Sequence, residues 1–142
     1  MSTEKKKRAQ TMGEELANTI SHGVGALLAA VGAAPLIVRG MMSGSGKTVF
    51  SLTAYGLSLI LLYTASAVYH AVRRPEVKRA LRVMDHCSIF VLILGTYIPM
   101  SLLVVGGRTG WMLFLTNTTL AVIGITLNAI DLKRFDRLSL VL

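Results

Sequence analysis

Four long stretches of this sequence contain no Asp, Glu, Lys or Arg, and they run from 16 to 38, 48 to 72, 86 to 107 and 109 to 130. Each reaches the roughly 20 residues that an α-helix needs to cross about 30 Å of hydrocarbon. Apolar runs of this length exceed the usual strand, and as soluble helices they would leave no face for water. The sequence therefore predicts an all-α integral membrane bundle with four transmembrane helices in this chain.

The basic residues are divided unevenly among the segments that connect these runs. Three of the 15 lie in the 39–47 and 108 connections, at Arg39, Lys47 and Arg108. The other twelve lie in the N-terminal tail, the 73–85 loop and the C-terminal tail: Lys5, Lys6, Lys7, Arg8, Arg73, Arg74, Lys78, Arg79, Arg82, Lys133, Arg134 and Arg137. Because cytoplasmic loops are rich in Lys and Arg, the pattern predicts a cytoplasmic N-terminus. This topology explains the net charge of +8 without any role in nucleic-acid binding. Membrane lipids are the expected partners.

The chain reads as one domain that follows a basic tail. We expect the tail to cover residues 1–15 and the membrane domain to cover 16–142, with turns near 42–47 and 106–110, where Gly and Ser gather. After the last basic cluster the sequence becomes apolar again over 138–142, which is too short to cross a bilayer. The segment is either an anchor at the headgroups or the start of a fifth span, and we favour the fifth span.

Ionisable residues near the spans are the candidates for function, because such groups are costly in hydrocarbon. His22 lies in the first run, His70 ends the second, and Asp85 with His86 opens the third. The predicted topology places them all toward the cytoplasmic side.

Helical spacing assigns several polar residues to common faces. In the second run an inward face is predicted from Ser51, Tyr55, Ser58, Ser66 and His70. In the third run the corresponding face is Asp85, Ser88, Leu92, Thr96 and Pro99, with a kink expected at Pro99 and close approach at Gly95. In the fourth run we expect interhelical hydrogen bonds or half-satisfied contacts from Asn117, Thr118, Thr119, Thr126 and Asn128.

These faces would bring Asp85 opposite His70. A histidine beside a carboxylate in a membrane interior admits three interpretations: a structural pair, a proton relay, or a site in which imidazole binds Zn²⁺ and the carboxylate holds a water. The residues alone leave all three open.

Several motifs occur in an order that resembles a known family. They are Glu15-Leu-Ala-Asn-Thr-Ile-Ser-His-Gly-Val-Gly25, Ser66-Ala-Val-Tyr-His70, Asp85-His-Cys-Ser-Ile89 and Gly95-Thr-Tyr-Ile-Pro99. Together they resemble the signatures of the bacterial hemolysin III proteins, relatives of the progestin and adiponectin receptors (the PAQR family). The resemblance implies a bacterial cell-membrane protein of seven helices, with zinc near the cytoplasmic side.

The resemblance also assigns roles to individual residues. His70 matches the second-helix zinc ligand, Asp85 the aspartate that acts through water, and Ser66 a nearby serine, whereas His22 and His86 match motifs that are not direct ligands. The family's last-helix H-x-x-x-H pair has no counterpart among the three histidines of this chain. We therefore expect Zn²⁺ only in a longer form of the protein.

A complete zinc site beside an aspartate and a serine suits hydrolysis, and the resemblance points to lipid amides of the ceramide type. In this hypothesis Asp85 positions or deprotonates the water and Ser66 supports the carbonyl. Membrane or lipid homeostasis is the corresponding biological role. The alternatives are a pore-forming cytolysin, as the family name suggests, and a small transporter, although Glu15 and Asp85 lie only at span ends.

Overall fold

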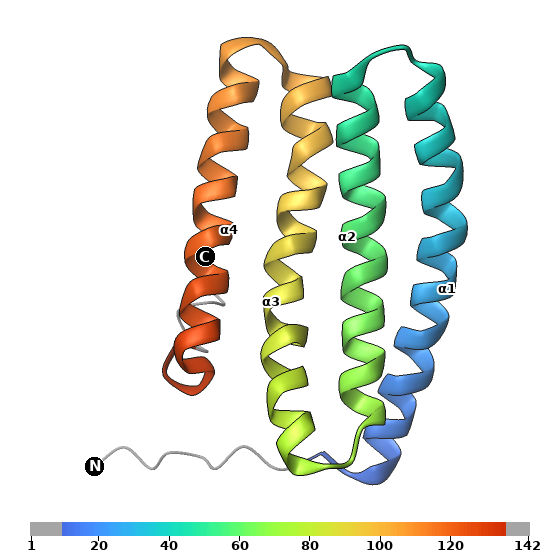
Figure 1. The fold of residues 1–142 in the computed structure, drawn as a ribbon, viewed down its shortest axis with the longest axis vertical. Helices are drawn as coiled ribbons and strands as arrows, with labels where there is room; N and C mark the ends of the chain where they lie inside the picture. Colours follow the sequence, from blue (N-terminus) through green and yellow to red (C-terminus); the bar gives the residue numbers. More distant parts are fainter. Residues whose placement is uncertain (1–9, 136–142) are drawn as a thin grey trace.

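In a computed structural model the chain is described over residues 10–135, with side chains described over 10–130. Within this part the elements are α1 (Met12–Met42), α2 (Gly46–Ala71), α3 (Pro75–Pro99), the π-helical segment η1 (Met100–Val105) and α4 (Gly107–Phe135) (Figure 1). No strand occurs among these residues, so the predicted all-α class is confirmed. The described residues contain four helical segments long and apolar enough to cross a membrane, η1 continuing the third.

All four helices begin earlier than the uncharged runs, and α1 and α3 differ from them the most. α1 starts at Met12, where the hydroxyl of Thr11 accepts from the backbone N–H of Glu14 (3.3 Å) and the carboxylate of Glu14 accepts from that of Thr11 (2.6 Å). This reciprocal capping box fixes the start of the helix in the predicted tail. The predicted 73–85 loop is mostly helical, because α3 starts at Pro75 and proline is well suited to the first helical position.

The four helices lie in one row. Figure 1 shows successive helices side by side and antiparallel, and α1, α2, α3 and α4 each pack along their length against the next. Within the described residues α1 and α4 do not touch. The row is therefore open, and only α2 and α3 have a helix on both sides.

Small residues let neighbouring helices approach closely, as is common in membrane bundles. A β-carbon on Gly56 of α2 would lie 2.8 Å from the β-carbon of Ala33 on α1. One on Gly95 of α3 would lie 2.6 Å from that of Ser58 on α2, which confirms the close approach expected at this glycine. These positions leave no room for a side chain.

The inward faces predicted from spacing are partly correct. On α2, Ser51, Ser58 and Ser66 are buried as expected. On α3, Ser88 is buried but Thr96 is exposed, so its predicted inward position is wrong. The contact with α2 is centred on Gly95, which rotates the following residue by about 100° toward the outside.

The polar residues of α4 bond within their own helix. The hydroxyl of Thr126 donates to the carbonyl of Val122 (2.7 Å). The same four-residue pattern holds for Asn117, Thr118, Thr119 and Asn128. The predicted interhelical hydrogen bonds are therefore wrong for these groups, because the preceding turn of the same helix offers a carbonyl within reach. Asn128 fits the half-satisfied alternative, since its buried Oδ1 has no partner.

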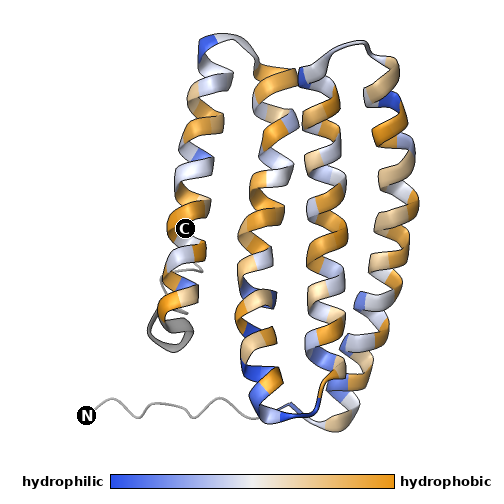
Figure 2. Cartoon of the chain, viewed as in Figure 1, coloured by the Kyte–Doolittle hydropathy of each residue, from blue (hydrophilic) through white to orange (hydrophobic). Residues whose placement is uncertain are grey.

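Large apolar side chains cover the outside of the row. Leu27, Val31 and Ile130 are 70%, 71% and 71% exposed, among many others. Figure 2 shows apolar residues along most of the helix lengths and hydrophilic residues gathered near the α2–α3 connection. A water-soluble protein rarely exposes so much continuous apolar surface, whereas lipid tails cover it without penalty. The chain is a multi-pass membrane protein.

Candidate functional site

Three helix termini meet where the chain is most basic. α1 begins, α2 ends and α3 begins at this end of the row, which we call the basic end and define by Arg73, Arg74, Lys78, Arg79 and Arg82 (Figure 1). The opposite end holds Arg39, Lys47 and Arg108. This alternation follows the charge pattern of the sequence, and the assignment of the basic end to the cytoplasm stays a prediction.

Glu15 joins all three helices at the basic end. Its Oε2 lies 2.8 Å from Nδ1 of His70 on α2, and its Oε1 accepts a hydrogen bond of 2.7 Å from Nζ of Lys78 on α3. The side chains of His70, Glu15 and Lys78 are 8%, 19% and 25% exposed, so the groups are largely removed from water. A carboxylate on this nitrogen fixes the orientation of the imidazole and leaves Nε2 as its other polar atom.

His22 lies two helical turns beyond Glu15 on α1 and extends the cluster into the row. Its ring is 5.8 Å from that of His70 and 6.0 Å from that of Tyr63, edge to face in both cases. Its Nδ1 is buried and has no hydrogen-bond partner. An unpaired buried nitrogen is costly, which marks this atom as one that a ligand or water would satisfy.

The cluster borders a cavity of about 460 Å³ at the ends of α1 and α2. Its polar lining includes Glu15, Thr19, His70, Arg73 and Lys78, and its apolar lining includes Met12 and Leu16. Both the charged groups and the apolar wall are suited to a molecule with a polar head and an apolar body. We call this the Glu15–His70 cavity.

The structure brings together only some of the residues that the sequence predicted to converge. His70 lies in the cluster, and Ser66 is buried one turn before it with no hydrogen bond from its hydroxyl to a described residue. Asp85 is half-buried on α3 and forms neither a hydrogen bond nor an ion pair with His70; the carboxylate on His70 is that of Glu15. The direct pairing of Asp85 with His70 is therefore not observed.

The carboxylate on His70 comes from α1, and the early start of α3 explains why Asp85 does not lie at the same level. Because α3 begins at Pro75, Lys78 is the residue level with the end of α2. Asp85 lies about 10 Å further along the helix at roughly 1.5 Å per residue. The proposed role of Asp85 as holder of a bound water stays a prediction, as does that of Ser66.

Sequence reasoning missed the roles of Glu15 and Lys78. The sequence places Glu15 at a span end and at the start of a family motif, and Lys78 among the charges that set topology, but it indicates no contact between them. The seven-residue spacing of Glu15 and His22 places them on one helix face and could have drawn attention to that face. No pattern in the sequence reveals that Lys78 reaches the same carboxylate.

The described residues do not by themselves fit a zinc ion. They contain no group of three or more His, Cys, Asp or Glu side chains that could hold a metal. Catalytic zinc sites normally use three protein ligands. The oriented imidazole of His70 and the unpaired nitrogen of His22 supply fewer ligands than such a site needs.

Comparison with known proteins identifies what the chain resembles. The sequence model of the family described as Haemolysin-III related matches residues 10–142. The chain is 38% identical over 138 residues to Hemolysin-3 of Bacillus cereus, covering 96% of this chain and 63% of that protein. It is also 38% identical over 129 residues to the Hemolysin-3 homolog of Bacillus subtilis, covering 91% of this chain and 61% of that protein. It thus spans less than two thirds of either relative, and no solved structure matches it.

Proposed function

The chain belongs to the hemolysin III family, and from this premise we propose that it works in the bacterial inner membrane in membrane-lipid homeostasis. Its N-terminus would lie in the cytoplasm, as the excess of basic residues at one end of the row favours. The observation that carries the proposal is the Glu15–His70–Lys78 cluster beside a cavity with an apolar wall. At the predicted cytoplasmic interface the cavity would lie at the level of the lipid headgroups, and its apolar wall supports a lipid-like ligand.

The chemistry that we propose for this site is hydrolysis of a lipid amide. His70 is the residue of this chain that would enter a zinc site, with the remaining ligands supplied from outside the described residues. Glu15 supports this role because it holds the imidazole from the opposite nitrogen, the usual arrangement around metal-binding histidines. Asp85 and Ser66 keep their proposed roles toward water and the substrate carbonyl.

Metal content tests the proposal. This chain and a form extended through its natural reading frame are purified in mild detergent, and bound zinc is measured by mass spectrometry. We expect stoichiometric zinc in the extended form, loss of zinc in His70→Ala and little zinc in the present chain. His86→Ala is the matched control, because the family resemblance gives that histidine no ligand role. Extended protein without zinc, or zinc retained in His70→Ala, would overturn the metal proposal.

A second measurement tests the reaction. Vesicles that contain a ceramide-type amide are incubated with the extended protein, and the released fatty acid is quantified. We expect release that is abolished in His70→Ala and Asp85→Ala. Zinc binding without release would leave a structural metal and remove the hydrolase from the proposal.

The names of the relatives favour a second candidate function. Both are called hemolysins, and a pore-forming activity in this chain would appear as conductance across a planar bilayer. Stepwise conductance that persists in His70→Ala would favour the pore. A silent bilayer, together with zinc in the extended form, would favour the hydrolase.

A further inference from the structure

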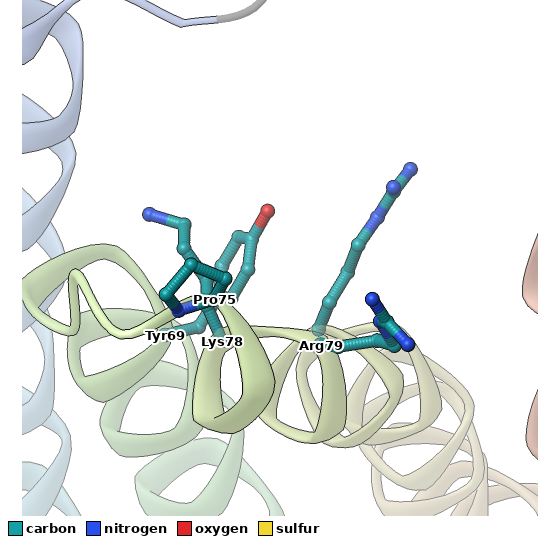
Figure 3. Close-up of a pocket in the computed structure, with 5 residues that line it drawn as sticks. Tyr69, Pro75, Lys78 and Arg79 are labelled. Carbon is teal, nitrogen blue, oxygen red and sulfur yellow. The ribbon is translucent and has the colours of Figure 1, made fainter.

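A second cavity at the basic end lies between the end of α2 and the first turns of α3. Its volume is about 540 Å³, and it is lined by Tyr69, Pro75, Lys78, Arg79 and Arg82. No carboxylate contributes to this lining. Figure 3 shows these side chains, with Lys78 and Tyr69 close together beside Pro75. We call it the Tyr69–Arg82 cavity.

Two of its cations have no partner among the residues that the structure describes. Lys78 is bonded to Glu15, so its charge is already balanced. Arg79 and Arg82 are one helical turn apart, and neither forms an ion pair or hydrogen bond with a described residue. Their guanidinium groups present planar, paired N–H donors of the kind that match phosphate oxygens. The cavity therefore holds two unbalanced positive charges.

Tyr69 gives the cavity a fixed wall. Its ring lies 4.7 Å from that of His70, and the ammonium group of Lys78 lies 5.0 Å from its centre. Its hydroxyl forms no hydrogen bond with a described residue and is free to donate. Tyrosine is enriched at the membrane–water interface, where its hydroxyl can reach a headgroup. The start of α3 adds to the attraction for an anion, since Arg74 provides no side-chain cap there.

From these observations we propose that the Tyr69–Arg82 cavity binds the phosphate headgroup of an anionic phospholipid. The cavity lies at the ends of two candidate membrane spans, where headgroups are present at high concentration. Basic pockets between transmembrane helices bind such headgroups. The site is distinct from the Glu15–His70 cavity, which it touches only through Lys78. It does not depend on zinc or on a hydrolase reaction.

The test compares lipid binding to the intact chain and to matched variants. The protein is purified in mild detergent, and native mass spectrometry counts the lipids retained from phosphatidylglycerol and from phosphatidylcholine with the same acyl chains. We expect preference for phosphatidylglycerol. The double variant Arg79→Gln/Arg82→Gln should bind it roughly 30-fold more weakly, at about fivefold for each cation near an anionic headgroup. The pair Arg79→Lys/Arg82→Lys keeps the charge but loses the paired donors, so we expect its binding to lie between that of the parent and that of the glutamine variant.

The matched control removes two arginines at the opposite end. Arg39→Gln/Arg108→Gln lowers the net charge by the same amount, and we expect it to leave the preference unchanged. An equal loss in both double variants would show diffuse attraction and overturn the site, as would an Arg79→Gln/Arg82→Gln variant that binds like the parent. Glycerol 3-phosphate is the third arm. Displacement of the lipid by this soluble phosphate at equal concentration would overturn the assignment to a lipid. Circular dichroism confirms that each variant is folded.

Discussion

The basic end and helix α4 use polar side chains in opposite ways. At the basic end Glu15, His70 and Lys78 come from three helices and bond to one another. On α4, polar side chains such as those of Thr118 and Thr126 donate to carbonyls of their own helix. The weak contact from the thiol of Cys87 on α3 to the carbonyl of Ile125 (3.7 Å) is a polar link to its neighbour.

The difference follows from how many neighbours each helix has. α2 is flanked by α1 and α3, so its polar face meets backbone and side chains of other helices. α4 packs against α3 and η1 and has an open side. Short polar side chains on the flanked helices also bond to their own helix, as Ser58 does to the carbonyl of Tyr55 and Ser88 to that of Asp85. The basic end differs because ionisable side chains of neighbouring helices meet there. Polarity in a span thus identifies a candidate face, and the neighbours decide whether that face becomes a cluster.

The largest expected effect comes from separating the helices that form the cluster. Gly95→Leu places a side chain where a β-carbon already lies 2.6 Å from that of Ser58. Both contacting groups belong to rigid helix cores, so α3 must move away from α2. We expect a loss of about 3 kcal/mol in folding free energy, measured by denaturation in mixed micelles followed by circular dichroism.

Gly32→Leu on α1 is the control for this substitution. Nothing lies within 4 Å of a β-carbon at Gly32, so the new side chain points into open space. Its stability should match that of the parent or exceed it slightly, since leucine favours helix more than glycine does. Equal losses in the two variants would contradict the close α2–α3 contact.

The next effect in size concerns the cluster itself. Glu15→Gln removes the charge that bonds to both His70 and Lys78, and the partners are largely shielded from water. We expect a loss of about 1–2 kcal/mol in the same denaturation experiment. Glu76→Gln, on an exposed residue of α3, is the matched control and should change stability by less than about 0.5 kcal/mol. A neutral Glu15→Gln would show that the bonds across three helices contribute nothing to the fold.

The sequence predicted the fold better than the site. Four uncharged runs are sufficient to specify four helices, because the length of hydrocarbon to be crossed is fixed. The buried face of α2 followed from helical spacing alone, since small polar residues gathered there. The partner of His70 could not be predicted in this way, because it depends on which face of α1 packs against the end of α2. The start of α3 at Pro75 brings Lys78 to the same carboxylate and places Asp85 further along the helix.

A smaller effect on stability is expected at Asn128, for which the sequence left two interpretations open. Asn128 on α4 is 1% exposed, and its Nδ2 donates to the carbonyl of Gly124 (3.0 Å) while its Oδ1 has no partner. Replacing it with leucine removes an unpaired buried oxygen. We expect Asn128→Leu to be neutral or to stabilise the chain by up to about 1 kcal/mol. A clear loss of stability would show that Oδ1 is satisfied by a group that the described residues do not include.

The smallest expected effect is at Thr126, whose exposed hydroxyl bonds to the carbonyl of Val122. That carbonyl belongs to the regular helix, so the side-chain bond is additional to the backbone hydrogen bonds. Thr126→Val keeps the shape of the side chain and removes only the hydroxyl. We expect a change below about 0.5 kcal/mol in the denaturation experiment, in contrast to Glu15→Gln at the basic end. If Thr126→Val were as costly as Glu15→Gln, the hydroxyl would have to bond to another helix, and the distinction between α4 and the basic end would be lost.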